Sequence, residues 1–317
     1  MHVLAAQGTG LFIQQIENGI VLGAIYALVA LGYTLVYGII ELINFAHGDV
    51  FMWGTMVTLT VTQAFHIGDG QVVGGFALVG LLILFIVLSM AFCAGLNVVI
   101  ERFAYRPLRT APRLAPLIAA IGVSFILENI AELWRGANSI SYPLQFPIIT
   151  LSLGPFSIGL LEILIILFSI GLMYALTRFI QGTKLGRAMR ATAQDPEAAA
   201  LMGVNINQTI ALTFLIGGAL AGAAGVAYTL EIRQVAFNTG FELGLIAFTA
   251  AVLGGIGNVT GAVLGGFAIG LVQALTIQYF PGGNGIEWID VTVFAILVLI
   301  LVFRPSGLLG QQIPNKA

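Results

Sequence analysis

Asn44, His47 and Asp49 place an amide, an imidazole and a carboxylate close together between two long apolar stretches of this chain. Such groups serve in acid–base catalysis and metal binding, and in apolar surroundings each must pair with a polar group or with water. The sequence offers no partners for that chemistry, because the 3 histidines are scattered and HExxH and GxSxG-like motifs are absent. We therefore expect neither an enzyme nor a metal site. The cluster is interpreted as a polar break that lines a translocation path, or as a hydrogen-bonded turn that fixes two helices.

A segment further along the chain carries start and stop signals for a short helix over 196–202. Asp195 is a candidate N-cap, and Pro196 follows at the first helical position, where its missing N–H does no harm. Glu197 complements the positive end of the helix dipole. Gly203 supplies a left-handed stop at the other end. The segment is predicted to form a short capped helix in a loop.

Small and apolar residues give this short helix a contact face, made of Ala198, Ala199, Leu201 and Met202. A helix with such a face can dock on a partner protein, and a capped loop helix without a partner is the alternative. The chain has no GxxxxGK[ST] motif, so it does not cradle ATP phosphates by itself.

The composition decides what kind of elements position these groups. Of 317 residues, 59% are hydrophobic and 8% are charged, and the mean hydropathy is +1.02. Soluble proteins carry roughly 25% charged residues, so this chain cannot cover a water-facing surface of its size. We expect an all-α, polytopic integral membrane protein in which residues 1–317 form a single transmembrane domain. The net charge of −2 argues against nucleic acid as a partner, and the single cysteine excludes an intrachain disulfide.

Long uncharged stretches predict the membrane spans, because about 20 apolar residues cross a bilayer as a helix. The stretch 243–286 is too long for one crossing and is broken by the turn-prone glycine cluster at 254–258. We expect about eight to ten transmembrane helices, some of them short or re-entrant. The expected spans are 16–40, 45–65, 74–100, 115–134, 158–179, 208–230, 243–256, 260–278 and 287–304.

Most of the 12 lysines and arginines fall in two loops, which predicts the orientation by the positive-inside rule. Two expected helices separate these loops, so both face the cytoplasm and the intervening loop 135–157 lies outside. Because each crossing changes the side of the membrane, counting the expected spans from these loops puts the N-terminus outside and the C-terminus in the cytoplasm. Residues 1–15 lack a basic residue and are not a signal peptide. The first loop carries Arg102, Arg106, Arg109 and Arg113, the second Arg178, Lys184, Arg187 and Arg190, and the C-terminal region Arg304 and Lys316.

Glu128, Glu132 and Arg135 lie on one face of the fourth expected span, near its outer end. Their spacing makes an ion pair between Glu132 and Arg135 geometrically easy. The face is interpreted as a contact for an external binding protein, or as a solvated helix end.

Glycines at four-residue spacing predict close contacts between helices, because such a stripe lets two backbones touch. The contacts are expected within the subunit, or against a second subunit around the pathway. The stripes are Gly257, Gly261 and Gly265, the neighbouring Gly266 and Gly270, and Gly218 and Gly222.

Glu197, Ala198 and Ala199, followed after three residues by Gly203, match the EAA signature of binding-protein-dependent ABC permeases. Further segments resemble hallmark segments of the branched-chain amino acid permeases (LivH type), in the same order along the chain. The resemblance runs from about residue 15 to residue 310 and rests on the segments 44–49, 101–109, 186–191, 248–257 and 305–310.

The resemblance implies a permease subunit of a bacterial ATP-driven importer that moves leucine, isoleucine or valine across the inner membrane without covalent chemistry. It implies as partners a second, homologous permease subunit, a pair of ATP-binding subunits that hold the ATP, and a periplasmic substrate-binding protein, with no cofactor in this chain. The alternatives are a same-family importer of urea, amides or other amino acids, and an ATP-independent channel or carrier. The loop of about 180–207 would dock on the ATPase through Arg187, Arg190, Asp195, Glu197, Ala198, Ala199 and Gly203.

Overall fold

The computed structural model describes residues 2–65, 73–112, 114–144, 149–153, 156–280 and 284–310. Every expected span corresponds to a helix, and the ends agree to within a few residues except at the start of the first helix, which begins well before residue 16. The all-α class is thus confirmed. Arg113 and Lys316 of the predicted basic regions lie outside the described residues. The nine helices are α1 (His2–Ile40), α2 (His47–Ala64), α3 (Gly75–Ile100), α4 (Leu114–Arg135), α5 (Leu160–Gly182), α8 (Ile206–Ile232), α9 (Thr239–Gly254), α10 (Val259–Tyr279) and α11 (Ile289–Phe303).

Six of the described helices are long and apolar enough to cross a membrane. The helices α9 and α11 are apolar but shorter, and α2 has 18 residues but is too polar to be counted with the six. The 16 residues of α9 rise about 24 Å, less than the roughly 30 Å of a hydrocarbon core. A polytopic membrane protein is confirmed, whereas the expected count of about eight to ten crossings exceeds what helix length and composition establish.

The helices differ in how deeply they are buried, which separates a core from a periphery. The most apolar stretch of α1 is 89% buried and that of α8 is 72% buried. The corresponding values for α3 and α5 are 17% and 22%, and large apolar side chains are exposed along both. An apolar exterior needs no polar cover in lipid, so α3 and α5 present their outer faces to the membrane.

Glycines bring α8 into backbone contact with α3. A Cβ atom at Gly218 would overlap the carbonyl oxygen of Cys93, and one at Gly222 would lie 2.5 Å from the carbonyl oxygen of Ser89. No side chain fits in such a gap, so this stripe packs against the chain's own α3 rather than against another subunit.

The helix α10 uses glycines against two neighbours. On one side Gly265 lies against the carbonyl group of Ala250 in α9, and on the other side Gly266 lies against Ala27 of α1. The placement of Gly257 on the same stripe is wrong, because this residue lies in the loop before α10 with φ of +93°. A Cβ atom there would meet no atom closer than 3.9 Å. Four-residue spacing does not reveal where a helix begins, so the predicted stripe included one glycine that precedes the helix.

The segment after α11 returns to the end of α9. The backbone amide of Leu308 donates to the carbonyl of Leu253 at 2.8 Å, and that of Leu309 donates to the carbonyl of Gly254 at 3.0 Å. The side chain of Asn258 in turn donates to the carbonyl of Leu309 at 2.8 Å. Carbonyls in the last turn of a helix lack partners inside the helix, so this segment caps α9.

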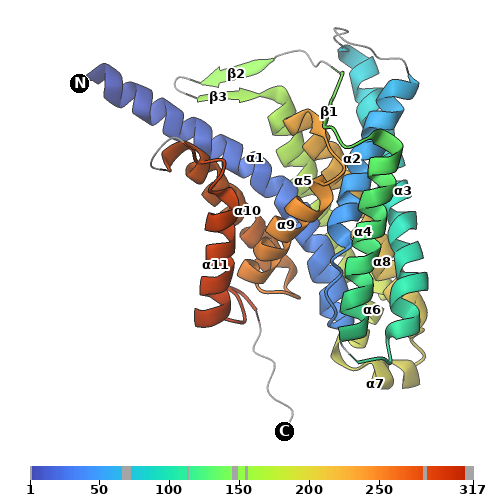
Figure 1. Cartoon of the computed structure of the whole chain (residues 1–317). Helices are drawn as coiled ribbons and strands as arrows, with labels where there is room; N and C mark the ends of the chain where they lie inside the picture. Colours follow the sequence, from blue (N-terminus) through green and yellow to red (C-terminus); the bar gives the residue numbers. More distant parts are fainter. Residues whose placement is uncertain are drawn as a thin grey trace.

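Short strands lie at one end of the helical bundle and two loop helices lie at the opposite end (Figure 1). The strands form two antiparallel pairs, which were not expected because strands this short show no clear alternation of apolar residues. The pairs are β1 (Ile140–Ser141) with β4 (Gln234–Val235), and β2 (Thr150–Leu153) with β3 (Phe156–Gly159); the loop helices are α6 (Lys184–Gln194) and α7 (Pro196–Leu201).

Candidate functional site

The helix α7 begins at the N-cap that the sequence predicts. One carboxylate oxygen of Asp195 accepts hydrogen bonds from the backbone amides of Glu197 and Ala198, both at 3.0 Å. Pro196 occupies the first helical position, where no amide hydrogen is needed. These bonds satisfy two of the amides that the first turn of a helix leaves open, so the start of α7 is fixed by its own sequence.

The helix α7 also ends as predicted, one residue earlier than expected. Gly203 has φ of +86°, and its amide donates to the carbonyl of Ala200 at 3.0 Å. The amide of Val204 donates to the carbonyl of Ala199, also at 3.0 Å. This pair of bonds is the Schellman arrangement, which needs a left-handed residue at its centre. Both ends of α7 are therefore closed by hydrogen bonds within its own segment.

The exposed surface of α7 is apolar at its tip. Leu201 is 89% exposed and Met202 is 85% exposed, whereas Ala199 is only 4% exposed. Ala199 therefore faces the rest of the chain, and the available contact surface consists of Leu201, Met202 and the exposed Ala198. Within the described part of the chain these two large apolar side chains are left almost uncovered, and they are suited to a complementary groove.

The neighbouring helix α6 is capped by Thr183, whose hydroxyl accepts a hydrogen bond from the amide of Gly186 at 3.0 Å. Arg190 donates to the carbonyl of Ile180 near the end of α5. The side chain of Arg187 is exposed and makes no hydrogen bond or ion pair within the described residues, whereas its backbone amide donates to the carbonyl of Thr183 at 3.1 Å. The basic face of α6 thus holds one arginine that is used inside the chain and one that is free for a partner.

A cavity of about 540 Å³ opens beside α6, between α1, α5 and the loop that joins α9 to α10. Its lining includes Tyr37 and Glu41 from the end of α1, Arg190 from α6, and Gly257 and Asn258 from that loop. Two of the segments that carry the family resemblance, 186–191 and 248–257, therefore come together at this end of the bundle.

Asn44 is fully buried and belongs to a hydrogen-bonded network. Its side-chain amide donates to Oδ1 of Asn97 in α3 at 3.3 Å, and the amide of Asn97 donates to the carbonyl of Phe214 in α8 at 2.6 Å. The hydroxyl of Tyr105 lies 3.2 Å from Oδ1 of Asn44 and 3.1 Å from the carbonyl oxygen of Ile43. Asn44 thus has the paired environment that its burial requires.

His47 and Asp49 are also fully buried, but their side chains make no hydrogen bond within the described part of the chain. The ring of His47 contacts the ring of Tyr33 edge-on, with 4.8 Å between centroids. An unpaired carboxylate in a membrane protein interior is costly, and such groups are candidates for function.

The surroundings of Asp49 offer partial compensation for its burial. Asp49 lies in the first turn of α2, and a Cβ atom at Gly240 in the first turn of α9 would lie 2.7 Å from its carboxylate. The N-terminal ends of two helices therefore approach this carboxyl group, and the helix dipoles favour its charged form. Gly48 lies against the backbone of Gly240 and Gly244, so nothing separates α2 from α9 at this depth.

None of the described cavities is lined by Asn44, His47 or Asp49. The three residues are brought together as the sequence predicts, but they are enclosed by the chain's own helices in this structure.

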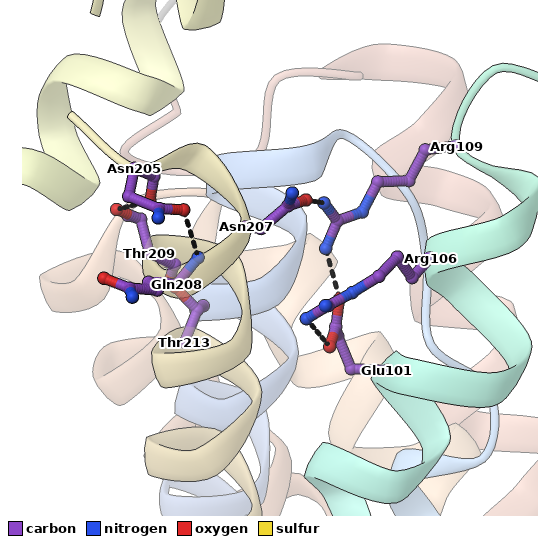
Figure 2. Close-up of polar contacts among 8 residues, drawn as sticks. All are labelled: Glu101, Arg106, Arg109, Asn205, Asn207, Gln208, Thr209 and Thr213. Carbon is purple, nitrogen blue, oxygen red and sulfur yellow. Dashed lines mark hydrogen bonds and ion pairs between the residues drawn. The ribbon is translucent and has the colours of Figure 1, made fainter. Parts of the chain in front are cut away.

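Sequence reasoning missed the chemistry at the end of α3. There the helix continues as a π-turn, η1 (Glu101–Tyr105), and a 3₁₀ turn, η2 (Arg106–Leu108). The carboxylate of Glu101 is fully buried and accepts hydrogen bonds from Arg106 at 3.1 and 2.8 Å and a further one from Arg109. Arg109 also donates to Oδ1 of Asn207 in the first turn of α8 at 2.6 Å (Figure 2). The signal was present as an acidic residue just before the basic loop.

At the opposite end of the bundle, the expected ion pair between Glu132 and Arg135 is not formed. Arg135 does not pair with Glu132 but donates to Gln63 at 2.7 Å and to Thr60 at 2.5 Å, both in α2. Its guanidinium also lies 4.2 Å from the centroid of the Trp134 ring. Tertiary contact with α2 outcompetes an exposed pair on one helix, which is worth little in water.

The first basic loop and the start of α8 lie at the same end of the bundle, because the Arg109–Asn207 hydrogen bond joins them. This agrees with the predicted parity, in which both basic loops face one side of the membrane.

Comparison with known proteins identifies relatives along nearly the whole chain. Residues 15–302 match the family model described as branched-chain amino acid transport system / permease component. The chain is 40% identical over 315 residues to the high-affinity branched-chain amino acid transport system permease protein BraD of Pseudomonas aeruginosa, across 96% of this chain and 98% of that protein. It is also 40% identical over 318 residues to the corresponding permease protein LivH of Escherichia coli K12, across 96% and 97%. Among solved structures, it is similar to PsaBC from Streptococcus pneumoniae in complex with Fab, with a TM-score of 0.44 and 13% identity over 92% of each chain.

Proposed function

The chain belongs to the branched-chain amino acid transport permease family, and we propose on this premise that it forms the path for branched-chain amino acids in an ATP-driven importer. It is a transport component rather than an enzyme. The observation that carries the proposal is α7, a helix capped at both ends whose exposed apolar tip, Leu201 and Met202, lies in the loop with the EAA signature.

In this proposal α7 is the coupling helix. Leu201 and Met202 enter a groove of an ATP-binding subunit, and burial of these two side chains supplies much of the contact energy. Glu197 at the start of α7 and Arg187 on α6 are exposed charges of opposite sign in the same loop, and in this proposal they orient α7 on the partner. Asp195 and Gly203 keep the helix short and closed, so that movement of the ATP-binding subunit carries the whole helix with it.

The partners follow from the same premise. A pair of ATP-binding subunits holds the ATP, a second and homologous permease subunit completes the path, and a periplasmic binding protein delivers the amino acid. The binding protein docks at the end of the bundle that carries the short strands, which lies opposite α7 (Figure 1). Glu128 and Glu132 of α4 are candidates for that contact.

The orientation proposed is that the end with α6 and α7 faces the cytoplasm. The motive is the concentration of basic residues there, including Arg102, Arg106 and Arg109 before α4. The N-terminus then lies outside, and the segment that caps α9 lies at the cytoplasmic side.

Transport in this scheme occurs by alternating access, in which ATP binding and hydrolysis switch the open side of the path. Asn44, His47 and Asp49 are candidates for the path. To reach it, α2 and α9 must separate, because Gly48 lies in backbone contact with Gly240 in the enclosed state described above.

The test is reconstitution. The chain is expressed with its ATP-binding, second permease and binding-protein subunits, purified as a complex and placed in liposomes. We expect labelled leucine, isoleucine and valine to accumulate only with ATP and the binding protein present. Accumulation without ATP would establish a carrier or channel instead.

The same liposomes test the cargo. Unlabelled urea, short amides and other amino acids compete with labelled leucine if the importer belongs to a branch of the family with a different cargo. Competition by urea or an amide at a lower concentration than by leucine would overturn the branched-chain assignment and leave the importer assignment intact.

A further inference from the structure

The buried carboxylate of Glu101 organises two arginines that come from its own chain segment. The π-turn places Arg106 five residues on, at a position from which its amide bonds the carbonyl of Glu101 and its guanidinium bonds the carboxylate. Arg109 binds the same carboxylate. Because a buried charge that is paired and hydrogen-bonded holds its partners in one geometry, these three residues form a fixed group at the end of α3.

The fixed group reaches the end of the coupling loop. The second arm of the Arg109 guanidinium donates to Asn207, two residues beyond Asn205, whose side chain caps α8 by accepting from the amide of Gln208 at 3.1 Å. Figure 2 shows Arg109 lying between Glu101, the first residue of η1, and Asn207 on α8. One guanidinium therefore ties α3 to the first turn of α8, which directly follows α7.

The same π-turn also reaches the polar break before α2. Tyr105, the last residue of η1, places its hydroxyl between Asn44 and the carbonyl of Ile43. The two ends of one turn thus hold different elements. Glu101 holds the start of α8 through Arg109, and Tyr105 holds the entry to α2.

We propose that η1 (Glu101–Tyr105) is a positioning element that transmits displacement of the α7–α8 junction to the start of α2, with Asn207 and Tyr105 as its two attachment points. The proposal rests on the proposed function, because it presumes that α7 is moved by an ATP-binding subunit. It assigns a role in transport to Asn207, which lies at the α7–α8 junction, and to Tyr105, which contacts the candidate path residue Asn44.

The choice of variants follows from burial. Replacing Glu101 would leave two arginines without their carboxylate and would damage the fold itself. Asn207 is exposed, so Asn207→Ala breaks the bridge and leaves Arg109 paired with Glu101 and accessible to water. Tyr105→Phe removes one hydroxyl and keeps the ring in place.

The experiment uses the complete importer in liposomes and measures amino acid uptake and ATP hydrolysis in the same sample. We expect Asn207→Ala and Tyr105→Phe to keep normal amounts of assembled complex and continued hydrolysis. Uptake per ATP should fall by about two- to thirtyfold, the range that coupling residues reach. Asn207→Asp keeps an acceptor for Arg109 and should restore the wild-type ratio.

Gln208→Ala is the matched control, because Gln208 is exposed on the same turn and only its backbone amide makes a described hydrogen bond. It should leave uptake per ATP unchanged. The double variant Asn207→Ala with Tyr105→Phe should lose no more than the stronger single variant, because both act on one connection.

The proposal is overturned if uptake per ATP stays at the wild-type value in both single variants, or if their only defect is less assembled complex. Additive losses in the double variant would overturn it as well. Failure of the proposed function has a separate signature, since the wild-type chain would then neither retain an ATP-binding subunit nor show uptake that depends on ATP.

Discussion

The imidazole of His47 fills the space beside Gly32: a Cβ atom at Gly32 would overlap Nε2 of the ring, with the carbonyl oxygen of Gly217 next at 3.3 Å. The size of the residue at position 32 on α1 therefore limits the size of the residue at position 47, at the start of α2, because both would occupy the same space. The polar break is held in place partly by the absence of a side chain on the neighbouring helix.

Gly32→Ala is expected to destabilise the protein by about 1–3 kcal/mol, the usual cost of overpacking a core. The reason is that the added methyl group must displace the His47 ring. Adding His47→Ala to the same chain removes the obstacle and should recover part of the loss. Thermal unfolding of the detergent-purified protein measures both, and equal stability of Gly32→Ala and the wild type would contradict the packing described here.

Gly265→Leu is expected to abolish the folded protein, because a side chain there meets the backbone of Ala250 in α9. Leu264→Ala should purify normally, since Leu264 is 50% exposed. Gly171→Leu on α5 is the control for glycine itself, because a Cβ atom at Gly171 meets no atom within 4 Å. Size-exclusion profiles after detergent extraction compare the three. A normal profile for Gly265→Leu would show that α9 and α10 tolerate separation.

Gly203→Val tests the closure of α7 without steric interference. No atom lies within 4 Å of a Cβ at Gly203, so the substitution causes no clash. Its cost comes from the left-handed backbone, with φ of +86°, which destabilises a residue with a side chain by about 1 kcal/mol. That is too little to unfold the protein, but it disturbs the turn that ends α7. We expect normal permease levels, weaker retention of the ATP-binding subunit during purification, and loss of uptake.

Glu197→Lys is expected to act like Gly203→Val, because it reverses a favourable charge at the start of α7. Co-purification and uptake are measured in the same cells. If both variants retain the ATP-binding subunit and transport normally, α7 is a capped loop helix without a partner.

Single cysteines test the orientation in a Cys93→Ala background. Thr110 and Gln194 are exposed at the end with the basic loops, and Asn138 is exposed at the opposite end. Each is replaced singly by cysteine. We expect an impermeant thiol reagent to label only the cysteine at position 138 in intact cells. Labelling at 110 or 194 from outside would reverse the orientation.

The sequence predicted local structure well wherever a few neighbouring residues decide it. Asp195 and Gly203 bound α7 because capping depends on side chains within one turn of the helix end. The glycine spacing on α8 and α10 also predicted close contact, because absence of a side chain is a property of the residue itself.

Contacts between segments that are distant in the sequence could not be predicted from it. In the sequence Arg109 is one member of a basic loop. Only the fold shows that it binds Glu101 and also Asn207, which lies 98 positions further along the chain. The burial requirement of Asn44 predicted a polar partner but did not identify Asn97. For Arg135 the nearest opposite charge in sequence was misleading, since groups on α2 lie closer in space.

The cap on α9 ties the completion of one helix to a segment that is synthesised much later. Leu253 and Gly254 are inserted well before the amides of Leu308 and Leu309 leave the ribosome, and until then their carbonyls lack these partners. A chain that stops before Leu308 would leave these two carbonyls without their partners, at a cost of about 1–3 kcal/mol for each buried group. The end of α9 is therefore closed only after the segment that follows α11 has been made and has folded back onto it.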